Sequence, residues 1–174
     1  MEPKYYRNWH LAKTGTEFKV TEFEWSLIRF MGSFQKWVTT VGGVVVDEDI
    51  KFTEHLILHV IRMQDRPKNS ATIARLINRD DIPNIQYSLR KLEAANLIQK
   101  IREKKGKTFA YTITPLGKEV TDEYAKIRAD LLLKSLLSIA NIDERLDESM
   151  NLLSILTGIY EESARSSATF SHRE

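Results

Sequence analysis

The sequence contains no cysteine, and this absence excludes several kinds of chemistry. Without a sulfur atom of this type, the chain can form no disulfide, bind no metal through a thiolate and sense no peroxide through a thiol. No apolar run approaches the roughly 18 residues that a transmembrane helix needs. The first residues show no apolar core followed by small residues, so we expect no secretory signal and a cytoplasmic protein.

The sequence patterns of enzymes are also missing. Gly42-Gly43 lacks the G-x-G-x-x-G context of a phosphate-binding loop, and the spacing of Ser, His and Asp residues suggests no catalytic triad. His55 and His59 stand four residues apart on a predicted helix, a spacing that can hold a metal, but no third ligand is identifiable. We therefore expect no enzyme, no cofactor, no metal and no catalytic residue.

What the sequence does contain is an uneven distribution of charge. The formal net charge is only +2, yet residues 66–107 hold eleven Lys and Arg against four Asp and Glu. Eleven minus four gives +7 for this stretch and leaves −5 for the rest of the chain. A basic middle between acidic ends suits a segment that neutralises phosphates, although a run of lysines alone is also typical of a solvated surface.

The N-terminal half begins with a long helix that is suited to dimerisation. A capping box at Thr21 and Glu24 predicts the start of this helix, and Gly42-Gly43 predicts its end. Its apolar residues recur at alternating steps of three and four, which is typical of a coiled-coil seam. They are Val20, Phe23, Leu27, Phe30, Phe34, Trp37 and Val41.

Three short helices and a hairpin are predicted next. The helices cover residues 53–64, a segment after the N-cap Ser70, and residues 83–96, where Ile85, Leu89 and Leu92 face inward. Alternating apolar residues on both sides of a turn at Gly106 then predict two strands.

Two further helices close the chain, and the expected fold is α+β and mainly helical. Thr114-Pro115 predicts the start of a helix that runs to about Ala140. A last helix covers about 143–162. The expected organisation is an arm (1–20), a dimerisation helix (21–48), a winged helix-turn-helix domain (49–114), C-terminal dimerisation helices (115–162) and a flexible tail (163–174).

Three short helices followed by a basic hairpin is the order of a winged helix-turn-helix domain, in which the third helix enters the major groove. The outward side chains of residues 83–96 suit this task, because Asn and Gln can pair with adenine and Arg with guanine. The hairpin would contact phosphates or an adjacent minor groove. The predicted DNA-contacting residues are Ser70, Asn84, Gln86, Tyr87, Arg90, Lys91, Arg102, Lys104, Lys105 and Lys107.

Four stretches of the sequence resemble the MarR family of transcriptional regulators. They are FTE at 52–54, SATIARL at 70–76, LRKLEAANLI at 89–98 and YTITPLG at 111–117, and the resemblance spans about residues 21 to 160. It implies a homodimer built by the first and last helices, a pseudo-palindromic double-stranded operator, and release by a small, often aromatic or phenolic, ligand. One departure is that Lys104-Lys105-Gly106-Lys107 replaces the usual Asp-x-Arg pair of the wing, so the wing arginine's role is not carried over.

The resemblance also implies an effector cleft between the dimerisation helices and the winged domain. The residues predicted to line it are Trp25, Arg29, Phe34, Thr40 and His59. Packing within the dimer explains the aromatic residues among them equally well. The alternative function for the whole chain is a winged-helix module that binds protein and has no sequence-specific DNA readout.

Overall fold

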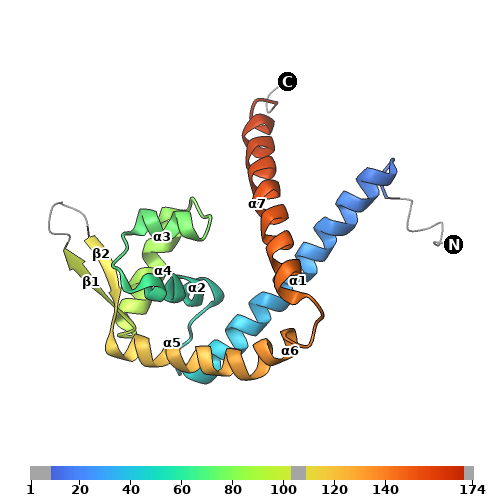
Figure 1. Ribbon diagram of the computed structural model, residues 1–174. Coiled ribbons are helices and arrows are strands. Elements are labelled where there is room, and N and C mark those ends of the chain that lie inside the picture. Colours follow the sequence, from blue (N-terminus) through green and yellow to red (C-terminus); the bar gives the residue numbers. More distant parts are fainter. Residues whose placement is uncertain (1–8, 103–108, 171–174) are drawn as a thin grey trace. The chain divides into compact units, whose positions relative to one another are not determined.

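The computed structural model describes residues 9–102 and 109–170, and it divides into two compact units (Figure 1). The first unit extends to Lys126 and the second begins at Ile127. Within the described residues, no helix is both long and apolar enough to cross a membrane. Each unit is described below by itself.

Helix α1 covers Gly15–Val45, and its N-cap, Thr14, lies seven residues before the predicted N-cap, Thr21. Thr14 and Glu17 form its capping box, in which the Glu17 amide donates to the Thr14 hydroxyl at 3.2 Å. The predicted box at Thr21 is therefore wrong: the Thr21 hydroxyl donates to the Glu17 carbonyl at 2.8 Å, inside the helix. Two Thr-x-x-Glu patterns lie seven residues apart, and the helix starts at the earlier one because nothing between them interrupts it.

Helix α1 also continues past its predicted end, because Gly42 serves packing there and not termination. A Cβ atom at Gly42 would overlap the imidazole ring of His55 on α2 (Phe52–Arg62). The absent side chain thus lets the two helices approach closely. The helix ends three residues later, at Val45.

The helix-turn-helix consists of α2, α3 (Ser70–Leu76) and α4 (Ile82–Ala94), with a short 3-10 turn, η2 (Met63–Asp65), after α2. The predicted inward residues of α4 are confirmed as buried. The prediction of Ser70 as an N-cap is wrong by one residue, because the Asn69 side chain accepts from the Thr72 amide at 2.9 Å. The core of this unit is formed mainly by Ile57, Leu58, Ile61, Ile73, Ile85, Leu89, Leu92, Leu97 and Ile98.

The predicted hairpin is confirmed as two antiparallel strands, β1 (Ile98–Arg102) and β2 (Phe109–Ile113). Ile98 pairs with Ile113 and Arg102 with Phe109, so the five positions of each strand are in register. Figure 1 shows the hairpin beside α3 and α4. The turn residues 103–108 lie outside the described residues.

Helix α5 (Pro115–Ile127) begins at the predicted residue, after Thr114. The Thr114 hydroxyl accepts from the Gly117 amide at 3.0 Å and lies 2.6 Å from the Asn96 carbonyl, so one side chain joins the helix start to the end of α4. A Cβ atom at Gly117 would overlap the carbonyl oxygen of Leu97. Gly117 of the YTITPLG stretch thus lets the first turn of α5 pack closely against the backbone just before β1.

The second unit is mainly helical, with turns at residues 137–141 and 168–170. It contains a π-helical segment, η3 (Arg128–Leu133), a short helix α6 (Lys134–Leu136) and a long helix α7 (Ile142–Ser167). The predicted helix to Ala140 changes its hydrogen-bond pattern at Arg128 and ends at Leu136, so its predicted end is wrong by four residues. Helix α7 runs to Ser167, five residues past the predicted end at Glu162.

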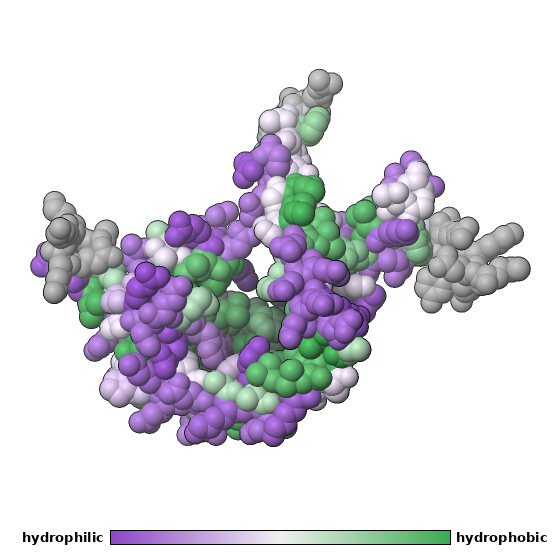
Figure 2. Space-filling model, in the orientation of Figure 1, coloured by the Kyte–Doolittle hydropathy of each residue, from purple (hydrophilic) through white to green (hydrophobic). Residues whose placement is uncertain are grey.

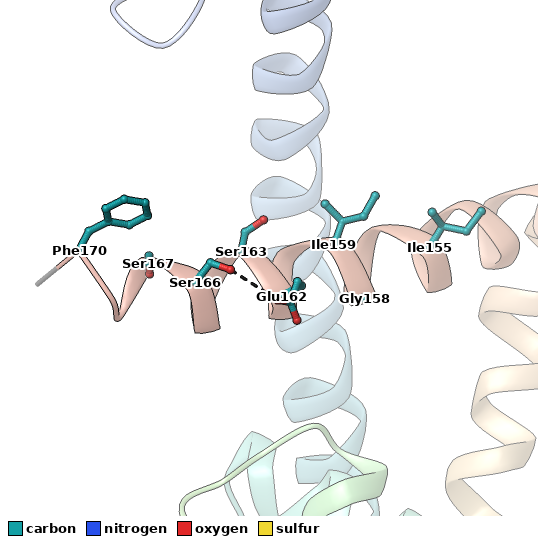
Figure 3. A pocket seen from close by; sticks show the side chains of 8 residues that line it. All are labelled: Ile155, Gly158, Ile159, Glu162, Ser163, Ser166, Ser167 and Phe170. Carbon is teal, nitrogen blue, oxygen red and sulfur yellow. Dashed lines mark hydrogen bonds between the residues drawn. The ribbon is translucent and has the colours of Figure 1, made fainter.

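Helix α7 carries an exposed apolar surface. Leu146, Met150, Leu153, Ile155 and Ile159 are all exposed, and Figure 2 shows apolar surface over this helix. A shallow hollow of about 630 Å³ lies near its C-terminal end, where Ile155 and Ile159 project from one side of the helix (Figure 3). Its remaining lining is Gly158, Glu162, Ser163, Ser166, Ser167 and Phe170.

Candidate nucleic-acid interface

Helix α4 presents a polar face opposite its buried one. Asp81 caps the helix, and its side chain accepts from the Asn84 amide at 3.2 Å. Asn84, Tyr87 and Arg90 are exposed, with Tyr87 at 59% of its full accessibility. This face carries donors, an aromatic ring and a positive charge, which are the groups that read base edges and contact phosphates.

A buried polar contact fixes α4 against α2. The Glu54 carboxylate accepts from the Ser88 hydroxyl at 2.8 Å and from the Lys51 amide at 2.9 Å. Both Glu54 and Ser88 are buried. Sequence reasoning placed neither residue in the site, because a buried pair separated by 34 positions leaves no local pattern.

Lys91 and Asn84, which are predicted to contact DNA, donate side-chain hydrogen bonds within the chain. Lys91 donates to the Asp49 carbonyl, and its Nζ lies 3.8 Å from the Asp49 carboxylate. The Asn84 side-chain amide donates to Asp81. Lys91 therefore ties α4 to the α1–α2 connection, and its predicted contact with DNA stays a prediction.

A hollow of about 370 Å³ lies between the start of α3, helix α4 and the hairpin. It brings together two of the predicted residues, Ser70 and Gln86, with five that were not predicted. Those five are Asn69, Ala71, Lys100, Phe109 and Tyr111. The alternation of the two strands was the available signal, since Lys100 faces Tyr111 in the hairpin register.

The ammonium group of Lys100, which lines this hollow, contacts an aromatic ring. The Lys100 Nζ lies 4.1 Å from the centre of the Phe109 ring, a cation–π contact, and Phe109 is itself exposed. Arg102 is exposed at the end of β1. The remaining predicted wing residues, Lys104, Lys105 and Lys107, lie outside the described residues.

One cation of the basic stretch is not at the surface. Lys68 is buried, and its Nζ donates to the carbonyls of Met63 and, at 3.1 Å, of Arg66. Burial lowers the pKa of Lys68, with a further contribution from the positive charge of Arg66. Lys68 thus donates to backbone carbonyls just after the end of α2, and its ammonium group is not free to neutralise a phosphate.

The five predicted effector residues lie on α1 and α2 and have contacts of different kinds. Trp25 stands edge-on to Trp9 at 6.2 Å, Phe34 stands edge-on to Phe52 at 5.9 Å, and Arg29 donates to Ser26. Thr40 is exposed, and the His59 ring lies 4.5 Å from that of Tyr124. A cavity of about 660 Å³ beside α1 is lined by other residues, including Met31, Gln35, Phe52 and Arg79, so an effector role for the five stays a prediction.

His55 is buried against Gly42, and its Nε2 has no hydrogen-bond partner. Burial lowers the pKa of His55, and the neighbouring charge of Glu54 opposes this shift. Among the described residues, no group of three or more His, Asp and Glu side chains is placed to hold a metal ion.

The comparisons with known proteins concern this same region and the fold as a whole. Residues 51–117 match the family model of the winged helix DNA-binding domain. No curated protein sequence matches the chain.

Solved structures resemble the chain over most of its length at low sequence identity. The transcriptional regulator BldR from Sulfolobus solfataricus has a TM-score of 0.64 at 21% identity, covering 81% of this chain and 98% of BldR. A MarR family transcription regulator has a TM-score of 0.63 at 12% identity, covering 87% and 99%. The Staphylococcus aureus MepR–DNA complex has a TM-score of 0.62 at 15% identity, covering 79% and 97%.

The fold prediction is therefore confirmed. The described chain is mainly helical, with a two-stranded wing between long N- and C-terminal helices. It contains a winged helix-turn-helix domain at residues 51–117 and has the fold of the MarR-family transcription regulators.

Proposed function

We propose that the protein is a cytoplasmic, dimeric transcriptional regulator that binds double-stranded DNA in a sequence-specific manner and has no enzymatic activity. The observation that carries the proposal is the exposed face of α4, with Tyr87 and Arg90, beside the hairpin. Helix α4 and the first strand of the hairpin both belong to residues 66–107, whose formal net charge is +7. An α-helix fits the major groove of DNA, and with α4 in the groove the basic hairpin would lie along the phosphates.

Dimerisation is part of this proposal because both long helices carry apolar side chains at the surface. On α1 these are Val20, Trp25, Ile28, Phe30, Met31 and Phe34. On α7 they include Leu146, Met150, Leu153 and Ile155. Exposed apolar side chains gathered on one helix favour an interaction site, and a two-fold pair would bury the same surface on both chains.

The likeness to the MepR–DNA complex supports binding to DNA in the same manner. A dimer with two α4 helices would read two half-sites about one helical turn apart, which gives a pseudo-palindromic operator. We further propose that a small aromatic ligand modulates binding through Trp25, Arg29, Phe34, Thr40 and His59.

A selection from randomised duplexes tests the proposal. The purified full chain is mixed with duplexes long enough to hold two half-sites, and bound sequences are recovered over several rounds. We expect an enriched motif with two-fold symmetry and a spacing of about 10 base pairs between half-sites. Recovery of unenriched sequence would favour the alternative, a winged-helix module that binds protein.

A further inference from the structure

Tyr111 stands where the wing, the α2–α3 connection and helix α4 meet. Its backbone forms an isolated β-bridge with Lys68: the Tyr111 amide donates to the Lys68 carbonyl at 2.9 Å, and the Lys68 amide donates back at 3.0 Å. On the other side, Tyr111 pairs with Lys100 of β1. Only 4% of Tyr111 is exposed, so neighbouring groups surround almost all of this residue.

The Tyr111 hydroxyl reaches α4 from this buried position. It donates to the Gln86 side-chain oxygen, Oε1, at 3.4 Å. A tyrosine hydroxyl is protonated at neutral pH and can donate, and burial raises the pKa of Tyr111 further above its ordinary value of about 10. Gln86 is half-buried and, with Tyr111, lines the hollow between α3, α4 and the hairpin.

We propose that Tyr111 is a specificity-determining residue that acts by positioning Gln86. With its oxygen directed toward Tyr111, the Gln86 amide presents its nitrogen, Nε2, to the DNA. Gln86 then reads a base as a hydrogen-bond donor instead of pairing with adenine through both of its polar atoms. This inference rests on the proposed function, since it assumes that α4 enters the major groove.

The donors and acceptors on the base edges predict which base Gln86 would disfavour. In the major groove, guanine offers O6 and N7, adenine offers N7 and thymine offers O4, all of them acceptors. Cytosine offers only the donor N4. A fixed amide donor would therefore face another donor at cytosine, and we expect cytosine to be rejected at one position of each half-site.

The experiment measures base preference in four proteins: the full-length wild type, Tyr111→Phe, Gln86→Ala and the double variant. The probe is the duplex enriched by the wild type, together with duplexes that carry each single-base substitution in one half-site. For the wild type, we expect cytosine at one position to weaken binding about three- to tenfold relative to the other bases, as for one lost hydrogen bond. Tyr111→Phe should remove most of this difference, and the double variant should match Gln86→Ala. Tyr124→Phe, which alters a buried tyrosine of α5, is the matched control and should keep the wild-type preference.

The outcomes separate this inference from the proposed function. If the wild type selects no motif, the proposed function itself fails. If a motif is selected but Tyr111→Phe keeps the wild-type preference, or weakens every duplex equally, Tyr111 has no role in specificity. The inference would also be overturned if Tyr111→Phe reduced the base preference by the same factor in the wild type and in Gln86→Ala. Tyr111 would then act through a residue other than Gln86.

Discussion

The buried carboxylate of Glu54 accepts a hydrogen bond from the Ser88 hydroxyl at 2.8 Å, and this contact joins α2 to the centre of α4. The other carboxylate oxygen accepts from the Lys51 amide at the start of α2. The orientation of the exposed face of α4 is thus set from its buried side. A change at Ser88 acts on the interface without touching any exposed residue.

Ser88→Ala is expected to lower the free energy of unfolding by about 1–3 kcal/mol, because the buried Glu54 carboxylate loses one of its donors. Urea unfolding followed by circular dichroism measures the change. Ser135→Ala removes an exposed hydroxyl that donates to Leu131 in the second unit, and it should cost much less. If the two substitutions lowered the free energy of unfolding equally, the buried contact with Glu54 would contribute no more to stability than an exposed hydroxyl does.

His55 predicts a loss of stability in mild acid. Its pKa is lowered by burial in the folded chain, whereas in the unfolded chain it should lie near the ordinary value of about 6.5. As the pH falls below about 6.5, the unfolded chain takes up a proton that the folded chain resists, so the free energy of unfolding decreases. His55→Gln should therefore show a smaller decrease between pH 7.5 and 5.5 than the wild type.

The control for this measurement is His10→Gln, which alters an exposed histidine. Urea unfolding at each pH gives the two slopes. If His10→Gln reduces the pH dependence as much as His55→Gln, burial of His55 is not the cause.

Much of the fold could be predicted from local patterns, and the errors have physical reasons. The order of the elements, the inward face of α4 and the start of α5 at Thr114 each follow from spacing or capping over a few residues. The start of α1 was misplaced because two capping patterns compete, at Thr14 and Thr21, and spacing alone does not rank them. The sequence predicts a helix end at Gly42, because the contact that explains this glycine is with His55, thirteen positions away in the sequence.

The site was less predictable because its determinants are contacts between distant positions. The exposed residues of α4 were identified from the helical period. Tyr111, Glu54 and Ser88 were missed, since each acts through a partner at least 25 residues away. The burial of Lys68 shows the same limit for charge, because a count along the sequence does not distinguish a buried cation from an exposed one.

The proposed dimer predicts a specific effect of charge on α1. Phe30 is 62% exposed and stacks on Phe34 with 6.2 Å between ring centres. The wild type should sediment as a particle of about 40 kDa, twice the mass of the 20.2 kDa chain. Phe30→Asp should shift it toward the monomer, because a carboxylate would be buried without a partner.

Lys36→Asp changes an exposed polar position of the same helix and should stay dimeric. A wild type that sediments as a monomer would refute the dimer.

Replacing Arg90 is expected to reduce the preference of the protein for its own operator sequence. It is exposed on α4, and an Arg that contacts guanine typically contributes about 1–3 kcal/mol to the preference for the correct base. Arg90→Ala should weaken binding to the enriched duplex by this amount and affect random duplexes far less. Lys118→Ala, an exposed cation on α5, should leave the preference unchanged. If Arg90→Ala and the wild type prefer the enriched duplex equally, α4 is not the reading helix.

The most direct test of the central claim compares two duplexes of identical composition at two salt concentrations. One is the enriched duplex and the other has its bases scrambled, and fluorescence anisotropy gives the affinity of the wild-type protein for each. We expect the enriched duplex to bind at least about a thousandfold more tightly. Both affinities should fall steeply as the salt concentration rises, because bound phosphates release their counterions. Equal affinities for the two duplexes, or affinities that do not change with salt, would contradict the account.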